Sequence, residues 1–327
     1  MPALSILRAG NMAKHALQQS RSATPPTPPA NWLTHEAGAG RSAISDTVTP
    51  DVIVSDVGVD AKKKAALGVP QILTRSFLCT PFLAYAVALV ALLVSQGVPS
   101  AVAGLLFPAG YVMLSVLGLE MATGSFSVMP IGWRLGYLDS RAVLSNWSWT
   151  FLGNLLGGVF FAWLLWFSLT KGGMLPAEGL LGVIIHLAEK KVSYQHYGLN
   201  GWLAAVGMGI LCNWLVSLGP IMAKSTHSMF GKIAIIWLPI ATFFALGFEH
   251  AVVNLFIFPL AILAGAQVSI SDWWLWNQIP VTLGNIIGAV LFNCALWAGT
   301  HYVKSESCAV GGAGDMPGTV AAAAALH

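Results

Sequence analysis

Six apolar runs, each long enough to cross a lipid bilayer, constrain the fold of this 327-residue chain more than any other feature. A helix needs about 20 consecutive apolar residues to span the hydrocarbon core. Only 9% of the residues are charged, whereas a soluble domain has roughly a quarter. The sequence therefore predicts an all-α integral membrane protein with six transmembrane helices. The runs cover residues 76–95, 100–121, 145–168, 199–222, 231–265 and 279–303.

The second and fifth runs are interrupted by polar residues. The second contains Glu120, passes into a Gly/Ser/Thr stretch and resumes near Val128. The fifth is too long for one crossing and contains Glu249 and His250. Non-helical backbone at membrane depth is tolerated only where it is buried in protein or lines a cavity. We therefore expect helices 2 and 5 to be broken.

An internal repeat relates the two halves of the chain. The sequence GNLLGGV at 153–159 recurs as GNIIGAV at 284–290, displaced by 131 residues. GLE at 118–120 recurs as GFE at 247–249, and in each case a proline follows the glycine twelve positions later. Duplicated units with an odd number of spans insert in opposite orientations. The sequence thus predicts an inverted 3+3 repeat, with a pathway at the repeat interface lined by the broken helices.

The Lys and Arg residues predict the orientation. If both termini are cytoplasmic, or lie in the equivalent compartment of an organelle, 13 of the 16 basic residues fall on the inner side. The outer loops then hold only Lys171, Lys190 and Lys191, as the positive-inside rule favours. A glycan on the sequon at Asn146, which this topology places inside, would overturn it.

The two ends differ from the central residues 49–304, which we assign to the membrane domain. Residues 1–48 are rich in Ser, Ala, Thr and Pro, which fits either a disordered tail or an organellar transit peptide. The membrane is thus left open between the plasma membrane and an organelle or plastid envelope. Residues 305–327 are predicted to be a disordered tail, and residues 57–73 an amphipathic helix along the membrane surface.

Ionisable residues inside the apolar runs are candidates for function. A charge at the bilayer centre costs about 2.5–3.5 kcal/mol on insertion scales, so such residues face a cavity or a partner. His250 can exchange a proton near neutral pH, which makes it a candidate proton donor for a permeating weak acid. The alternative is a neutral histidine satisfied by a hydroxyl. Thr123, in the matching break of the second run, is a candidate for that hydroxyl.

Two pairs of polar residues occupy equivalent repeat positions. We interpret Glu120 and Glu249 as acceptors for backbone N–H groups at the breaks rather than as a proton supply. A buried amide must find hydrogen-bond partners, so we expect Asn154 and Asn285 to cap exposed backbone there. These residues are predicted to be structural while lying next to the pathway.

Other chemistries find no support in the motifs. The four cysteines have neither disulfide-framework nor CxxC spacing, and His186 and His196 fit no metal-ligand pattern. The formal charge of +3 comes without a basic patch, which argues against nucleic acid. Motifs of hydrolases, zinc proteases and nucleotide binding are absent from the sequence. We predict no enzyme activity, no metal and no cofactor.

Five segments carry a resemblance to a known family. They are GLEMATGS at 118–125, EKKV at 189–192, LCNW at 211–214, GFEHAVVN at 247–254 and IPVTLGNI at 279–286. Over roughly residues 49–304 the chain resembles the formate/nitrite transporter family, and within it the nitrite-, formate- and bicarbonate-type members of a eukaryotic branch. The resemblance implies symmetric homopentamers in which each aquaporin-like protomer has its own pore for small monovalent weak-acid anions.

The resemblance also implies roles by position. His250 looks like the family's central pore histidine and Thr123 like its partner on the loop of span two. Lys191 resembles the vestibule lysine that attracts anions. Ala122 stands where many relatives carry a bulky residue, which is expected to widen the slit. The other implied residues are the pore-side Asn213 and Asn285, the constriction residues Phe107 and Phe243 on either side of the histidine, and Tyr111 and Met121 beside Ala122.

The mechanism that the resemblance implies is pH-dependent permeation of nitrite, formate or bicarbonate. An anion loses its charge by accepting a proton near His250 and crosses the hydrophobic constriction as the neutral acid, since such a constriction excludes a hydrated ion. The alternative is an aquaporin-like channel for water or neutral solutes, although the chain has no Asn-Pro-Ala motif. The sequence chooses neither among the anions nor between a channel and proton-coupled transport.

Overall fold

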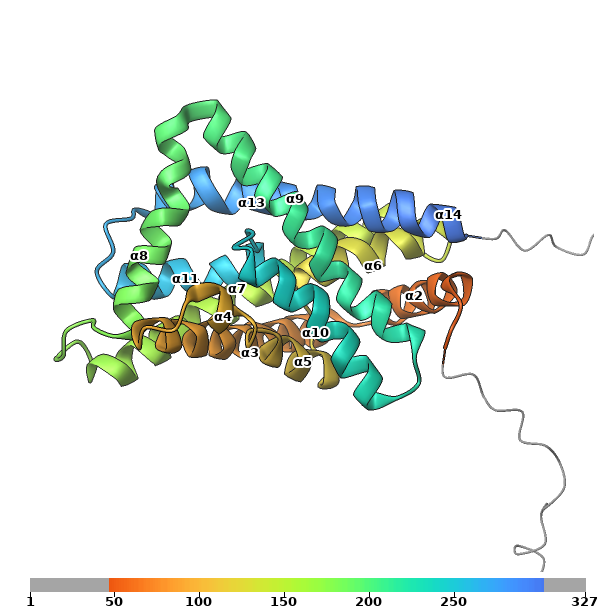
Figure 1. Ribbon diagram of the computed structural model, residues 1–327. Coiled ribbons are helices and arrows are strands. Elements are labelled where there is room, and N and C mark those ends of the chain that lie inside the picture. The colour runs from red at the N-terminus through yellow and green to blue at the C-terminus, as the bar shows by residue number, and fades with distance from the viewer. Residues whose placement is uncertain (1–46, 303–327) are drawn as a thin grey trace, which may run out of the picture. The chain divides into compact units, whose positions relative to one another are not determined.

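The computed structural model describes residues 47–302, which are helical apart from loops and one isolated antiparallel bridge between Thr47 and Thr226 (Figure 1). Four helical stretches are long and apolar enough to cross a membrane. They are Val69–Ser95, Ser140–Thr170, Leu180–Ser225 and Ile270–His301. Three shorter apolar stretches cover Ser100–Val116, Met229–Ala245 and Ala251–Leu263. The predicted all-helical membrane fold is confirmed. The tails assigned to residues 1–48 and 305–327 lie almost wholly outside the described residues.

The first half of the chain contains α2 to α7. The predicted second span is divided among three of these helices. In order they are α2 (Pro50–Ala65), α3 (Val69–Ser95), α4 (Ser100–Gly104), α5 (Pro108–Val116), α6 (Ala122–Arg134) and α7 (Ser140–Thr170).

The second half begins at α8 and ends in one continuous helical stretch that includes two π-helical segments. The π-helical segments are η3 (Trp274–Gln278) and η4 (Gly288–Ala298), on either side of α13 (Ile279–Ile287). The other elements are α8 (Leu180–Val192), η1 (Ser193–Tyr197), α9 (Gly198–Met222), η2 (Ala223–Ser225), α10 (Met229–Ala245), α11 (Ala251–Leu263), α12 (Ile270–Trp273) and α14 (Gly299–His301).

The breaks in the second and fifth spans lie at equivalent positions of the repeat. After α5 the chain turns at Gly118, with φ of 63°, and after α10 it turns at Gly247, with φ of 71°. Side chains rarely adopt this left-handed conformation, so glycine suits both turns. Met121 and His250 are then extended, with φ of −119° and −114°, immediately before α6 and α11 begin. The sequence prediction of two broken helices is confirmed.

Each half also begins with a helix that precedes its first long span. α2 carries Lys64 in its last turn and α8 carries Lys191 in its last turn. The sequence analysis expected three spans per repeat and missed α8, because its 13 residues are too few to cross a bilayer. Each repeated unit therefore includes a short helix before its first long helix.

The helix before the first span differs from the prediction. We expected an amphipathic helix at 57–73 along the membrane surface, but α2 spans Pro50–Ala65. Pro70 lies in the first turn of α3, where proline's missing N–H is tolerated, so a new helix starts inside the expected one. Val57 and Ala61 are buried in a core cluster with residues of α6, and α2 packs on protein.

The repeated glycines lie at close crossings between helices. A Cβ on Gly153 of α7 would lie 2.6 Å from the Ser76 side chain and 2.9 Å from the Leu73 carbonyl oxygen of α3. A Cβ on Gly284 of α13 would lie 2.2 Å from the Val206 carbonyl oxygen of α9. Small residues allow such backbone approach in lipid. These crossings bring the neighbouring asparagines of both halves against the helix breaks.

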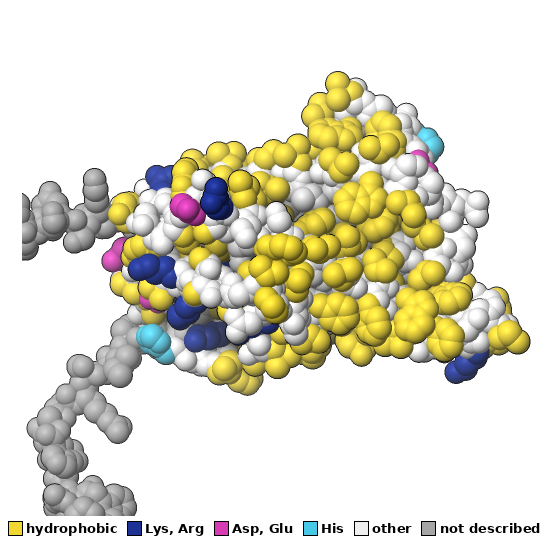
Figure 2. Space-filling view, turned by 180° about the vertical axis from the view of Figure 1, so that it is seen from behind, with side chains coloured by type: hydrophobic (Ala, Val, Ile, Leu, Met, Phe, Trp, Pro, Cys, Tyr) yellow, Lys and Arg dark blue, Asp and Glu magenta, His cyan; other side chains and the backbone are white. Residues whose placement is uncertain are grey.

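Apolar side chains cover much of the face in Figure 2, and Lys and Arg gather toward one end of it. Leu203 on α9 and Leu238 on α10 are 53% and 63% exposed. An apolar band of this kind with charges near its ends is the surface of a protein embedded in lipid.

Candidate functional site

The two helix breaks meet inside the protein. Thr123 in the first turn of α6 and His250 immediately before α11 contact each other, with Thr123 Oγ1 3.1 Å from His250 Nε2. The side chains are 0% and 2% exposed. These residues are 127 positions apart, so their contact depends on the packing of one half of the repeat on the other.

The backbone of α11 fixes the hydrogen-bonding role of each ring nitrogen in His250. The Val253 N–H donates to His250 Nδ1 at 3.1 Å, so Nδ1 acts as an acceptor. In a neutral ring Nε2 then carries the hydrogen and donates to Thr123 Oγ1. The Thr123 hydroxyl hydrogen remains available for another acceptor. The centre therefore presents one immobilised imidazole and one hydroxyl.

Asn154 on α7 closes the first break. Its Oδ1 accepts from the Ala122 N–H at 2.9 Å. Its Nδ2 donates to the carbonyl oxygens of Ser76 at 2.8 Å and Glu120 at 3.1 Å. The amide thus satisfies two backbone groups at the interruption of span two, the Ala122 N–H and the Glu120 carbonyl, and joins the break to α3 through Ser76.

Asn285 on α13 makes the same set of contacts in the second half. Its Oδ1 accepts from the Ala251 N–H at 2.9 Å. Its Nδ2 donates to the carbonyl oxygens of Gly209 at 2.8 Å and Glu249 at 3.0 Å. The repeat read from the sequence is therefore matched atom by atom in the structure.

Asn213 on α9 supports Thr123 through its backbone. Asn213 Nδ2 donates to the carbonyl oxygens of Thr123 at 3.0 Å and Asn285 at 2.8 Å. Ser217, which the sequence analysis missed, donates to the same Thr123 carbonyl at 3.2 Å and to Asn213 Oδ1 at 3.0 Å. Ser217 lies one helical turn after Asn213, and this spacing could have identified it from the sequence.

The two glutamates pair with lysines, which differs from the interpretation made from the sequence. Lys64 is hydrogen-bonded to Glu120, and Lys191 Nζ donates to Glu249 Oε2 at 2.6 Å. Within residues 47–302 no backbone N–H donates to either carboxylate in the observed hydrogen bonds. Asn154 and the second half's asparagine already take the N–H groups at the breaks, so the carboxylates face the lysines instead.

Glu249 is the more extensively bonded glutamate. Asn254 and Asn277 donate to its Oε2 at 3.0 Å and 3.3 Å, and the Tyr194 hydroxyl lies 3.5 Å from its Oε1. Asn277 also donates to the Lys191 carbonyl oxygen at 3.1 Å. Lys191, implied by resemblance to attract anions, is 11% exposed in its side chain and lies in an ion pair.

Three phenylalanines form one cluster beside the histidine. The Phe107 ring contacts Phe243 edge-on at 5.6 Å between centroids and stacks on Phe244 at 3.9 Å. The Phe243 ring lies 5.6 Å from the His250 ring. The expectation that Phe107 and Phe243 lie on either side of His250 is wrong, because α5 packs on α10 and brings both rings together.

Tyr111, Met121 and Ala122 are buried, with exposures of 2%, 4% and 0%. The Tyr111 hydroxyl donates to the Val216 carbonyl oxygen of α9 at 3.4 Å. Met121 immediately precedes α6, as His250 immediately precedes α11. The repeat therefore places a thioether in one half where the other half has an imidazole.

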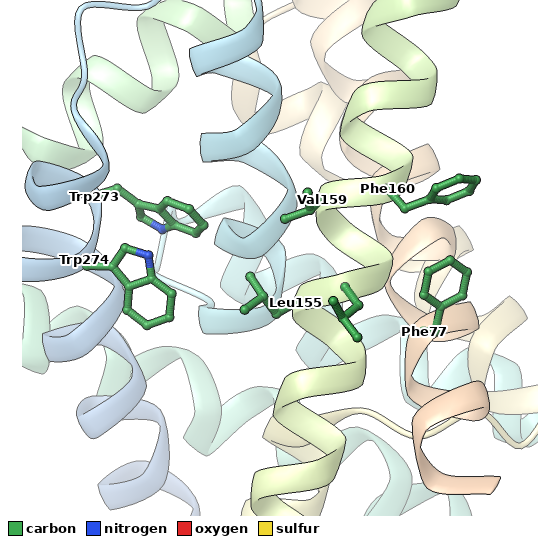
Figure 3. Close-up of a pocket in the computed structure, with 7 residues that line it drawn as sticks. Phe77, Leu155, Val159, Phe160, Trp273 and Trp274 are labelled. Atoms are coloured by element: carbon green, nitrogen blue, oxygen red, sulfur yellow. The ribbon is translucent and has the colours of Figure 1, made fainter. Parts of the chain in front are cut away.

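An apolar pocket of about 610 Å³ lies on α7, apart from these residues. Figure 3 shows Trp273 and Trp274 facing Leu155 and Val159 of α7, with Phe77 of α3 on the other side of that helix. The lining contains no charged side chain. This pocket suits hydrocarbon and offers an anion no hydrogen-bonding partner comparable to the His250 centre.

Fold and site together define a helical membrane protein whose two interrupted helices meet at a buried polar centre beside aromatic rings. The family model of formate/nitrite transporters matches residues 51–298. The chain belongs to the formate/nitrite transporter family, and it is therefore a membrane channel or transporter.

Relatives and solved structures agree with this assignment. A probable formate transporter of Methanothermobacter thermautotrophicus is 35% identical in an alignment of 264 positions that covers 73% of this chain and 91% of the relative. The formate channel FocA of Haemophilus influenzae is 33% identical in an alignment of 217 positions that covers 60% of this chain and 72% of FocA.

Two solved structures share the fold. An FNT family ion channel matches 74% of this chain and 96% of its own length, with a TM-score of 0.64 and 25% identity. A pentameric formate channel with formate bound matches 68% and 94%, with a TM-score of 0.57 and 24% identity. The predicted family and its aquaporin-like helical fold are confirmed.

Proposed function

We propose that this chain carries small monovalent weak-acid anions across a lipid bilayer through a pore that passes His250, in a pH-dependent manner. Formate is the first candidate because the relatives above are named for it. Nitrite and bicarbonate are the further candidates from the sequence. The observation that carries this proposal is the buried contact between Thr123 Oγ1 and His250 Nε2 where the two breaks meet.

The permeating species in this scheme is the neutral acid. Protonating His250 would cost its hydrogen bond from the Val253 N–H, which favours the neutral ring. A neutral ring that gave up its Nε2 hydrogen would become an anion, so His250 acts by positioning, and the permeating anion takes its proton from hydronium in the solvent before it reaches the ring. His250 Nε2–H and the Thr123 hydroxyl then bind the oxygens of the acid.

The phenylalanine cluster supplies the barrier to ions. The rings of Phe107 and Phe243 are 0% and 1% exposed and offer no hydrogen bonds, so a hydrated anion pays its full desolvation cost there. Lowering the pH raises the fraction of neutral acid. Uptake therefore rises as pH falls.

The working form in this proposal is a homopentamer of six-span protomers with both termini in the cytoplasm or its organellar equivalent. A solved relative of the same fold is described as pentameric. The described Lys and Arg residues fall mostly on one side of the membrane segments, as the positive-inside rule favours. In this arrangement Lys64 and Glu120 lie toward the inner mouth, and Lys191 and Glu249 toward the outer mouth.

The test is uptake of labelled formate, nitrite and bicarbonate into proteoliposomes across a range of pH. We expect uptake to rise as pH falls in the native protein. His250→Ala and His250→Asn should lose this dependence, because without the Nε2–H donor the neutral acid is no longer bound at the centre and uptake falls to the background at every pH. A pH dependence unchanged in both variants would remove His250 from the mechanism.

The alternative is a channel for water or neutral solutes. Its support is that both partly buried lysines near the site, Lys64 and Lys191, are ion-paired, which leaves the centre with neutral donors. Osmotic shrinkage of the same liposomes separates the two functions. Faster shrinkage without uptake of any of the three anions would favour the alternative.

A further inference from the structure

The two halves differ in the residue that follows each glutamate by five positions. In the second half this residue is Asn254, and in the first half it is Ser125. Asn254 Nδ2 makes two donations, to Glu249 Oε2 at 3.0 Å and to Asn277 Oδ1 at 2.7 Å. The second half thus links its glutamate to a neighbouring helix through one side-chain amide.

The first half has an asparagine equivalent to Asn277 but no amide equivalent to that of Asn254. Asn277 stands eight residues before Asn285, and Asn146 stands eight residues before Asn154. Asn146 on α7 is 2% exposed. Its neighbour Trp147 donates from Nε1 to the Ser125 carbonyl oxygen at 3.0 Å, so the turns that carry Asn146 and Ser125 lie against each other.

The polar atoms of this region in the first half have no hydrogen-bond partner among residues 47–302. They are Ser125 Oγ, both amide atoms of Asn146, and Thr150 Oγ1 one helical turn further along α7. Ser125 and Thr150 are 0% exposed. A buried polar atom left unpaired costs about 1–3 kcal/mol, so four such atoms in one place require further donors and acceptors.

Glu120 likewise has fewer hydrogen-bond donors around it than a buried carboxylate can accept. Its observed partner within the described residues is Lys64, whereas Glu249 receives donations from several side chains. A carboxylate has about four acceptor positions. A glutamate that is 4% exposed needs more than one of these to be filled.

We propose that the first half contains a buried water-binding site between Ser125, Asn146 and Glu120, in which a water molecule takes the place of the Asn254 amide nitrogen. Water has two hydrogens to donate, as that amide does, and matches the donations to the carboxylate and to the asparagine oxygen. It also accepts from the Ser125 hydroxyl. The serine side chain has two fewer heavy atoms than that of asparagine, which leaves room for the water oxygen.

The residues further along this interface also favour water. Thr150 corresponds to Val281 in the second half. Ser127, whose buried hydroxyl likewise has no hydrogen-bond partner in the described part of the chain, corresponds to Phe256. The first half is therefore both smaller and more polar where α6 meets α7. A site of this chemistry takes water or a neutral hydrogen-bonding molecule of similar size, and it excludes apolar solutes.

The inferred water gives the two glutamates different hydrogen-bond partners. A bound water exchanges its protons with solvent, whereas a side-chain amide holds Glu249 in a fixed network. This inference goes beyond the proposed function, since it concerns the first half alone and holds for whichever anion is carried.

The test compares single-particle maps of the pentamer in nanodiscs for the native protein and Ser125→Asn. We expect an ordered water peak within hydrogen-bonding distance of Ser125 Oγ and Asn146 in the native map. The Ser125→Asn map should show the new amide in its place. A native map that resolves other buried waters but shows no peak at this position would overturn the proposal.

Thermal unfolding supplies a second measurement. Ser125→Asn should raise Tm by about 1–2 °C, the shift that corresponds to about 1 kcal/mol in a chain of 327 residues. The reciprocal variant Asn254→Ser should gain a water peak beside Glu249, and Ser100→Asn at an exposed position serves as the control. A lower Tm for a folded Ser125→Asn, with Ser100→Asn unchanged, would also contradict the site.

Discussion

The two halves of this protein close their helix breaks in the same way but surround their glutamates differently. Asn154 and Asn285 make three matching hydrogen bonds each, within 0.1 Å of one another. Glu120 is paired with a lysine, whereas Glu249 is also held by amides. An interrupted membrane helix thus requires its amide cap, while the partners of the carboxylate are open to change.

The residues that immediately precede α6 and α11, unlike the asparagine caps, differ between the two halves. Met121 occupies this position in α6 and His250 in α11, so the repeat places a titratable group in one half only. Thr123 supplies the hydroxyl that the imidazole contacts. A duplicated scaffold therefore carries an asymmetric centre, and the following predictions compare the halves from the largest expected effect to the smallest.

Removing either asparagine cap should have the largest effect on stability. Asn154→Ala and Asn285→Ala each remove the acceptor of one buried N–H and a donor to two carbonyl oxygens, which should cost about 3 kcal/mol or more. Thermal unfolding in detergent should show similar losses for both. Asn200→Ala at an exposed position of α9 is the control. A loss in only one half would mean that the caps are not equivalent.

Replacing each glutamate by glutamine should lower the stability by different amounts in the two halves. Glu249→Gln leaves a lysine that is 11% exposed without its anion and disturbs several further donors, whereas Glu120→Gln affects a lysine that is 22% exposed. Breaking a buried ion pair costs about 3–5 kcal/mol. We expect Glu249→Gln to approach this range and Glu120→Gln to lie below it. Equal losses of Tm would show that the amides around Glu249 contribute nothing.

Removing the hydroxyl at the contact between the halves should have a smaller effect on stability. Thr123→Val removes the hydroxyl that lies 3.1 Å from His250 Nε2 while keeping the shape of the side chain. The expected loss is about 1–2 kcal/mol of stability together with slower formate uptake at low pH. Thr123→Ser keeps the hydroxyl and should retain uptake. Native uptake in Thr123→Val would exclude the hydroxyl from the pathway.

The lysines of α2 give the smallest predicted effect. Lys63 contacts Asp60 at 3.4 Å, with side-chain exposures of 73% and 36%, and such surface pairs are worth about 0–1 kcal/mol. Lys63→Ala should therefore leave Tm nearly unchanged. Lys64→Ala, one position along, should lower Tm because it leaves Glu120 unpaired. The reverse order would contradict the assignment of Lys64 as the partner.

Much of the fold was predictable because the lipid environment limits the choices. Apolar runs of bilayer length and the repeated GN motif predicted the broken helices and the duplication. Sequence did not predict α8, because 13 residues fall below the length of a span, or the end of α2 before Pro70. Nor does an apolar pattern distinguish π-helical turns, such as η4, from α-helix.

The site was less predictable because its contacts join distant parts of the chain. The sequence singled out His250, Thr123 and the asparagines from their polarity in apolar runs. It offered no means of choosing Lys64 over its two neighbouring lysines as the partner of Glu120. The joint position of Phe107 and Phe243 depends on how α5 packs against α10, which no local pattern encodes.

A double-mutant cycle on formate uptake tests the central claim that the two halves act as one unit at the Thr123–His250 contact. Initial rates at low pH are measured in proteoliposomes for the native protein, Thr123→Val, His250→Asn and the double variant. If the contact is the functional unit, the double variant should be no more impaired than the more impaired single variant. Effects that multiply as independent changes would contradict it.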